Sequence, residues 1–152
     1  MSNVFSVRCG LMGETKIAKI TVEWCAEKLL PRFRTLDIEV IFRNFSVRDE
    51  TLAECRHIEG NEFEIHIQKG MKVFDLISAL CHEMVHVKQY VRKELRDVYA
   101  GRKKPRQIGT MWKKSPRNWV KVNYEEQPWE KEAYRLEKAL AIECLTEAHS
   151  DF

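Results

Sequence analysis

The segment 73–95 constrains the fold of this chain more than any other. Its apolar residues recur at steps of three and four, which is the spacing of one face of an α-helix. They are Val73, Phe74, Ile77, Leu80, Cys81, Met84, Val87, Val91 and Leu95. A turn signal at Gly70 precedes them. We therefore predict one long amphipathic helix over residues 73–95.

Four other segments predict helices and strands around this central helix. Residues 14–33 and 128–148 carry apolar residues at helical spacing, and Pro128 suits the first turn of a helix. Residues 36–42 and 63–67 alternate apolar with polar or charged residues and are rich in isoleucine, as half-buried strands are. The order of these segments predicts an α+β chain.

Length and composition favour one domain over residues 1–152. The chain has 152 residues, of which 44% are apolar and 32% charged, so it can bury a core without disulfides or other staples. It has no apolar run long enough to cross a bilayer, and its first residues lack the pattern of a signal peptide. Its five cysteines are an odd number without CxxC spacing, which indicates reduced thiols. We expect a cytoplasmic protein without a membrane partner.

Residues 97–127 show no convincing period and contain two prolines and two glycines, so they predict an extended basic loop. The net charge of +3 is unevenly spread, because residues 101–124 hold eight Lys or Arg and no acidic residue. Trp112, Trp119 and Tyr124 lie between these basic residues. Basic side chains bind phosphates and exposed aromatic rings stack on bases, so the loop could hold single-stranded nucleic acid. The alternative is a solvated surface whose tryptophans attach the loop to the core.

The sequence Cys81-His82-Glu83-Met84-Val85-His86 lies in the middle of the predicted central helix. Residues four apart share a helix face, so both imidazoles can bind one ion. Catalytic zinc takes three protein ligands and one water, and Glu83 can reach that water as a general base without binding the metal. The pattern predicts a zinc-dependent hydrolase site. The alternative is that His82 and His86 are partly buried structural histidines.

A third ligand has to come from elsewhere in the chain, and the last predicted helix offers three carboxylates. Its apolar stripe consists of Trp129, Ala133, Leu136, Leu140 and Cys144. Glu130 and Glu137 flank one edge of this stripe, and Glu132 flanks the other. Each could reach the core, where a carboxylate needs a metal or a ligand histidine as its partner. Alternatively, they form surface pairs with Lys or Arg, and helix geometry does not choose among the three.

The segments CHEMVHVKQ and EEQPWEKEA together resemble the small single-domain zinc metallopeptidases common in bacteriophages and bacteria. These are related to gluzincins, minigluzincins and the SprT-like group, and the resemblance covers roughly residues 36–140. It implies a zincin-like α+β fold, in which a small mixed or antiparallel sheet packs on the active-site helix and flanking helices. If the chain is phage-encoded, it implies the host cytoplasm as the location.

The resemblance also implies particular site residues. Gluzincin-type relatives take their third ligand from a glutamate that opens an E-x-x-A or E-x-x-x-D pattern, which here matches Glu130, with Glu132 as second choice. Several gluzincins orient a ligand histidine with Asp or Asn where this chain has Tyr134, so Glu137 or Tyr134 would take that role. SprT proteins often use a third histidine, for which His149 is the only downstream candidate.

The function implied by this resemblance is a zinc-dependent metallopeptidase that acts on protein or peptide substrates. It implies that the strand at 63–67 is an exposed edge that binds the substrate in extended form through backbone hydrogen bonds. An oxyanion stabiliser is also needed, and Tyr124 and Tyr134 are both candidates. Two other hypotheses remain open: a catalytically silent zinc-binding module that binds nucleic acid or a regulatory protein partner, and a hydrolase of a non-protein amide such as cell-wall peptide.

Overall fold

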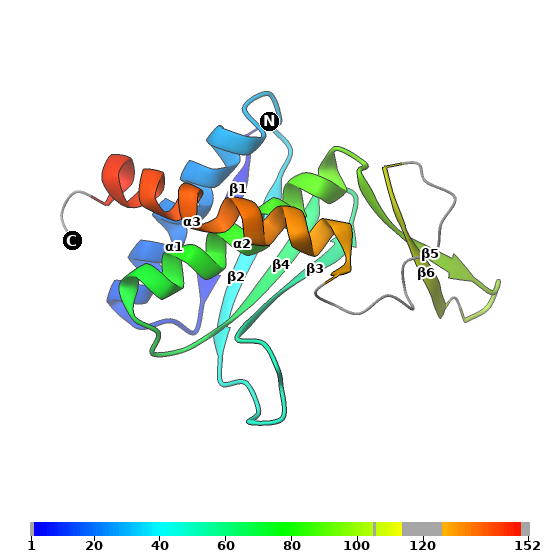
Figure 1. Ribbon diagram of the computed structural model, residues 1–152, viewed down its shortest axis with the longest axis horizontal. Helices are drawn as coiled ribbons and strands as arrows, with labels where there is room; N and C mark the ends of the chain where they lie inside the picture. The colour runs from blue at the N-terminus through cyan, green and yellow to red at the C-terminus, as the bar shows by residue number, and fades with distance from the viewer. Residues whose placement is uncertain (1, 105, 114–125, 150–152) are drawn as a thin grey trace.

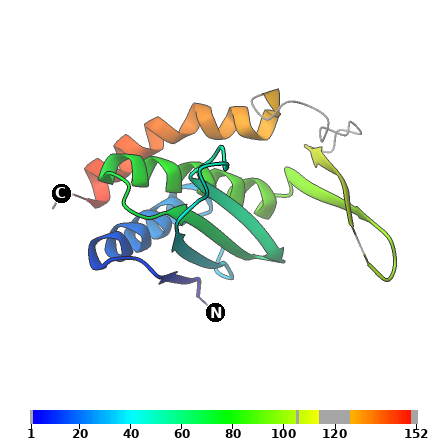
Figure 2. The same cartoon turned by 90° about the horizontal axis from the view of Figure 1, so that it is seen from below.

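Two helices, α1 and α2, lie on one face of a mixed four-stranded sheet, the third helix, α3, packs against them, and a two-stranded sheet extends from the same body (Figures 1 and 2). The computed structural model describes residues 2–104, 106–113 and 126–149. Within these ranges the elements are β1 (Val4–Arg8), α1 (Met12–Leu29), β2 (Asp37–Arg43), β3 (Ala53–Glu59), β4 (Glu62–Gln68), α2 (Val73–Val91), β5 (Leu95–Ala100), β6 (Arg106–Trp112) and α3 (Pro128–Ala148). The prediction of an α+β chain is confirmed.

The large sheet has the strand order β1-β2-β4-β3. β2 is parallel to both β1 and β4, and β3 is antiparallel to β4. The prediction that residues 63–67 form the exposed edge is wrong, because β4 pairs on both sides: Ile65 is opposite Val40 of β2 and Cys55 of β3. Among the described residues, the outer strand on this side is β3, which the sequence pattern does not predict.

The position of β3 explains why its sequence looks unlike a strand. An outer strand tolerates charged side chains, which also protect its free edge from unwanted pairing. Four of its seven residues, from Arg56 onward, are exposed. Glu54 and Arg56, two positions apart on β3, form an ion pair with each other. These charges interrupt the alternation of apolar and polar residues that identifies β2 and β4.

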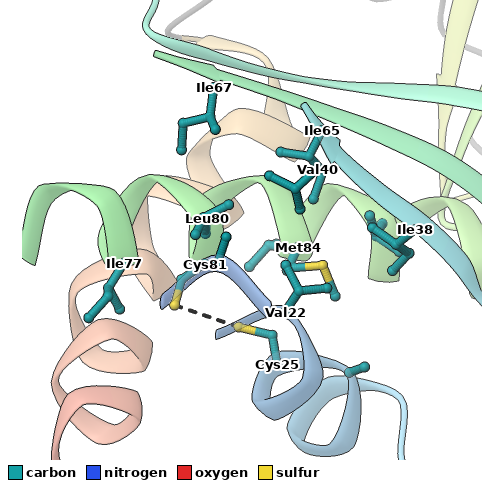
Figure 3. Close-up of a cluster of buried hydrophobic side chains, with 14 of the residues drawn as sticks. Val22, Cys25, Ile38, Val40, Ile65, Ile67, Ile77, Leu80, Cys81 and Met84 are labelled. Atoms are coloured by element: carbon teal, nitrogen blue, oxygen red, sulfur yellow. Dashed lines mark hydrogen bonds between the residues drawn. The ribbon is translucent and has the colours of Figure 1, made fainter. Parts of the chain in front are cut away.

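The core lies between the sheet and the helices (Figure 3). Ile38 and Val40 of β2 and Ile65 of β4 point toward Leu80 and Met84 of α2, and all five are fully buried. Burying such a side chain contributes about 1.5–3 kcal/mol. From below, Val22 and Cys25 of α1 close the core, with the Cys25 and Cys81 sulfurs 3.6 Å apart. α2 is thus held on several sides, which fixes the direction of its remaining face.

The helices follow the predicted segments with shifts at their ends. α1 begins and ends a few residues earlier than the predicted 14–33, and α3 begins at Pro128 as predicted. α2 ends at Val91 because Lys93 adopts a left-handed conformation with φ 59°, so the apolar Leu95 already belongs to β5. None of the three described helices combines the length and apolar character that crossing a bilayer requires.

β5 and β6 form an antiparallel hairpin that projects from the helix–sheet body (Figures 1 and 2). The prediction of an extended loop over residues 97–127 is therefore wrong for residues 97–100 and 106–112. Leu95 pairs with Trp112 and Asp97 with Thr110, and the register shifts between Val98 and Tyr99. Short strands with interspersed basic residues and glycine carry little periodicity, so only the pairing reveals them. Residues 114–125 lie outside the described part.

Candidate metal centre

His82, His86 and Glu130 meet between α2 and α3. The histidines lie one turn apart on α2, and Glu130 lies in the first turn of α3. Glu130 Oε1 is 3.0 Å from His82 Nε2 and 3.1 Å from His86 Nε2. One ligand atom from each residue lies within 4.8 Å of the others, and each side chain is buried. This group could hold a metal ion.

The two ring nitrogens that point away from Glu130 indicate where the imidazole protons lie. His86 Nδ1 is 2.8 Å from Gln89 Oε1. The Gln89 amide nitrogen donates to the Trp129 carbonyl at 2.9 Å and to Glu132 Oε1 at 3.1 Å, so the amide oxygen must be the atom that faces His86. An amide oxygen only accepts hydrogen bonds, and the His86 proton therefore lies on Nδ1.

His82 has an equivalent arrangement with a carboxylate. Glu137 Oε2 lies 3.3 Å from His82 Nδ1, which favours a proton on that nitrogen. In the neutral rings of His82 and His86, both Nε2 atoms then present lone pairs to the same Glu130 oxygen. Three acceptors that face one another in a buried site require a cation between them, either a proton or a metal ion.

The pKa of His86 also shows that this site favours positive charge. Burial lowers the pKa of His86, but the hydrogen bond with Glu130 and the charge of Glu83 outweigh burial and raise the pKa to about 9. The site thus stabilises positive charge strongly. Two histidine nitrogens and one carboxylate oxygen form a donor set that is typical of protein metal sites, as is the placing of an amide oxygen or a carboxylate at the other nitrogen of each histidine.

Glu83 lies beside this group but does not contact it as a ligand. Its side chain is buried, and its Oε2 has no hydrogen-bond partner in the part of the chain that the structure describes. A buried polar atom without a partner costs roughly 1–3 kcal/mol, so this oxygen needs a partner that the described residues do not supply. Burial raises the pKa of Glu83, although the nearby His86 and His82 oppose this. The carboxyl therefore gains a proton more readily than an exposed glutamate does.

Two cavities open on either side of Glu83. We call the larger one, of about 270 Å³, the Glu130 cavity; it is lined by Glu83, His86 and Glu130. We call the other, of about 130 Å³, the small cavity; it is lined by Glu83, His82, Tyr134 and Glu137. Both cavities are bordered by Ala53, the first residue of β3, and by Thr51 just before it, so a molecule beside the start of β3 would lie next to Glu83.

The remaining candidates for a third ligand are not part of the group. Glu132 binds Lys88 at 3.0 Å and Gln89 at 3.1 Å. Burial would raise the pKa of Glu132, but these two hydrogen bonds lower it. His149 is buried at the opposite end of α3, and its Nε2 lies 2.9 Å from Thr21 Oγ1. At about 1.5 Å of rise per residue, that end is some 28 Å along the helix from Glu130.

Of the two tyrosines that the sequence offers as oxyanion stabilisers, the structure describes one. Tyr134 lies beside the site, where its ring packs edge-on against His82 with centroids 4.7 Å apart. Tyr124 lies outside the described residues. The sequence pattern does not point to Gln89, which connects the His86 ring to α3. Its position three residues after His86, on the same helix face, was the available signal.

The comparisons with known proteins give no family for this chain. No protein-family model, curated protein or solved structure matches it. What this site does must therefore be inferred from its own residues and from the fold that positions them.

Proposed function

We propose that this protein is a zinc-dependent metallopeptidase with a zincin-like fold. His82, His86 and Glu130 would hold zinc, and Glu83 would act as the general base. The observation that carries the proposal is the convergence of three buried donors beside a glutamate oxygen that lacks a partner within the described ranges. The resemblance of CHEMVHVKQ and EEQPWEKEA to small gluzincin-type peptidases agrees with it.

The donor set fits the proposed ion. Two imidazole nitrogens and a carboxylate oxygen are a ligand set that catalytic zinc takes in proteins, with one position left for water. When bound, zinc would activate that water and polarise the substrate carbonyl. Gln89 and Glu137 would hold the two rings with Nε2 directed at the ion, because each faces the opposite ring nitrogen.

Glu83 would move the proton that peptide hydrolysis requires. The water oxygen bonds to the carbonyl carbon, the C–N bond breaks, and one water proton passes through the Glu83 carboxylate to the leaving amine nitrogen. The raised pKa of Glu83 suits a group that both accepts and releases a proton. Tyr134 lines the small cavity together with His82 and Glu83, and we propose that it stabilises the negative charge on the carbonyl oxygen.

β3 would align the substrate, in place of the strand at 63–67. Its far side is free of backbone partners within the described chain, and an extended peptide can add to such a strand as an antiparallel neighbour. Ala53, its first residue, and Thr51, two residues before it, border both cavities beside Glu83. A peptide paired with β3 would therefore pass the buried carboxylate.

The test compares Glu83→Gln with the wild-type protein. We expect the variant to retain zinc at one ion per chain and to lose hydrolysis of an unbiased peptide library by roughly 10²–10⁴-fold, because the amide cannot accept the proton. Zinc is measured by elemental analysis and cleavage by mass spectrometry. Glu62→Gln, which changes an exposed carboxyl of β4, is the matched control and should behave as wild type. Undiminished cleavage by Glu83→Gln would refute the mechanism.

The alternative function is a catalytically silent zinc-binding module that binds nucleic acid or a regulatory protein. The observation that favours nucleic acid is the turn of the projecting hairpin, where Arg102, Lys103 and Lys104 are exposed. Its test is the affinity for single-stranded DNA as a function of salt, which should fall steeply with ionic strength if these residues bind phosphates. Tight zinc and strong DNA binding without cleavage of any peptide would favour this alternative.

A further inference from the structure

A third cavity, of about 770 Å³, lies where the β5–β6 hairpin meets the end of α2 and the β3–β4 turn. We call it the hairpin cavity. Its apolar lining consists of Ile58, Tyr90, Val91, Leu95, Tyr99 and Met111. Its volume lies within the range of about 300–1,000 Å³ that is typical of ligand sites.

The polar groups of the hairpin cavity already have partners. Tyr90 donates its hydroxyl to Asp97 at 3.2 Å, and the Gln107 amide donates to the same carboxylate at 3.2 Å. The His57 ring packs against the Tyr90 ring with centroids 4.9 Å apart, and its Nε2 is 2.7 Å from the Gly60 carbonyl. These contacts leave mainly apolar surface for an occupant.

The charged lining residues do not offer a buried charge for recognition. Lys93 and Arg96 are exposed to solvent, and Glu94 pairs with Lys88 at 2.7 Å. In contrast, two large apolar side chains of the lining are exposed: Ile58 at 47% and Tyr99 at 58%. Exposed apolar side chains gathered around one cavity are typical of a binding surface.

The hairpin cavity adjoins one of the two cavities beside the candidate metal centre. It shares Tyr90 and Leu95 with the Glu130 cavity. β3 runs past both cavities, since Ala53 and Cys55 line the Glu130 cavity and His57 and Ile58 line the hairpin cavity. At about 3.3 Å per residue, two or three residues of an extended chain span roughly 7–10 Å between them.

The direction of β3 decides which part of a substrate reaches the hairpin cavity. β3 runs from the Glu130 cavity toward the hairpin cavity. A peptide paired antiparallel to β3 runs the opposite way, so its amino-terminal part lies over the hairpin cavity. The residue that reaches this cavity is therefore two or three positions before the bond that lies beside Glu83.

We propose that the hairpin cavity binds a large apolar side chain of the substrate peptide, two or three residues on the amino-terminal side of the cleaved bond. The position of this side chain relative to the cleaved bond rests on the proposed peptidase function. Its apolar character is inferred from the lining of the hairpin cavity alone. The chain would thus select peptides with an aromatic or large aliphatic residue at this position. The hairpin, which forms one wall, would be a specificity element.

The test uses extended peptides that carry either Phe or Gly at one position and are otherwise identical. Hydrolysis by the wild-type protein gives kcat/KM and the cleaved bond, and fluorescence anisotropy with Glu83→Gln gives binding without hydrolysis. We expect about tenfold higher kcat/KM and about tenfold tighter binding for the Phe peptide, because burying an aromatic ring is favourable. The cleaved bond should lie two or three residues after Phe.

Two variants of the lining connect this preference to the hairpin cavity. Ile58→Glu and Tyr99→Lys each place a charge on an exposed lining position, and we expect each to bring the Phe-to-Gly ratio close to one in both assays. Ile142→Glu alters an equally exposed side chain, at 57%, on α3 outside this cavity and should keep the ratio. Circular dichroism confirms that each variant is folded.

The outcomes separate this proposal from the peptidase function. Phe-selective binding that both variants abolish, without any hydrolysis, refutes the peptidase function and supports the hairpin cavity as the apolar site. Hydrolysis without a Phe preference overturns the cavity proposal. Three other results also overturn the cavity proposal. They are a Phe preference that survives both variants, a Phe preference on the carboxy-terminal side of the cleaved bond, and a failure to bind either peptide.

Discussion

Replacing Gln89 with leucine tests the proton arrangement on which the metal centre depends. Gln89 is fully buried, and its side chain joins the His86 ring to the start of α3. Leucine has a similar volume but neither accepts nor donates a hydrogen bond. In Gln89→Leu the His86 ring would lose the oxygen that holds its Nδ1 proton, and the other ring nitrogen would no longer be directed at Glu130.

The expected magnitude follows from the contacts that are lost. Removing a group that orients a metal-bound histidine weakens metal binding about 10–100-fold, which equals about 1.4–2.7 kcal/mol. The substitution also removes the two hydrogen bonds that the Gln89 amide nitrogen donates, to the Trp129 carbonyl and to Glu132, at a cost of about 0.5–1.5 kcal/mol each in the free energy of unfolding. The loss of zinc affinity should therefore accompany a moderate loss of stability.

The assay is a zinc titration in competition with a chromophoric chelator, combined with urea unfolding of the metal-free protein. Gln68→Leu is the matched control. Gln68 accepts from the Phe45 backbone N–H at 2.7 Å and donates to Asn44 at 3.0 Å, so its loss also removes hydrogen bonds, but far from the histidines. We expect the control to lose stability and keep its zinc affinity. Wild-type zinc affinity in a folded Gln89→Leu protein would refute the reasoning.

Three further predictions follow from the structure. Glu130→Ala should abolish tight zinc binding while Glu132→Ala retains it, measured by elemental analysis, because only Glu130 reaches both histidines; the opposite pattern would exchange their roles. Burial raises the pKa of Glu54, but hydrogen bonds from its partners Arg56 and Arg43 outweigh burial and lower the pKa in the folded protein. The ionised Glu54 side chain therefore stabilises the folded state fully above its ordinary pKa of 4.5, and this contribution is lost as pH falls through the lower pKa of the folded state. Glu54→Gln should therefore lower the melting temperature at pH 7 and leave it nearly unchanged at pH 2, and an equal effect at both would contradict this. Ile65→Ala, in the fully buried core, should cost about 2–5 kcal/mol in urea unfolding, and a cost below 1 kcal/mol would show that the core is not packed as described.

The sequence alone determined the features that depend on near neighbours. The three- and four-residue period of segment 73–95 identifies α2, and the four-residue spacing of His82 and His86 places both rings on one face, since both follow from helix geometry. Pro128 marks the start of α3 for a similarly local reason, because proline suits the first turn. Each of these depends on residues within one or two turns of helix.

Tertiary packing decided which glutamate meets the histidines. Helix geometry left Glu130, Glu132 and Glu137 all able to reach the core. The packing of α3 on α2 brings Glu130 to both Nε2 atoms, Glu137 to His82 Nδ1, and Glu132 to Lys88. The distances between two helices depend on how their side chains interlock, and this information is spread over contacts that are far apart in the sequence.

Strand pairing likewise became visible only in three dimensions. β3 and the β5–β6 hairpin carry charged residues that hide their periodicity, and each is identified by the strand opposite it. Whether a strand such as 63–67 is internal or at the edge depends on whether a neighbour exists on each side. The alternation of side chains along a strand indicates which face of the sheet is buried. The neighbouring strands are held by backbone hydrogen bonds in the plane of the sheet, and the backbone is the same for every residue except proline. The sequence of a strand therefore does not show whether it has a neighbour on each side.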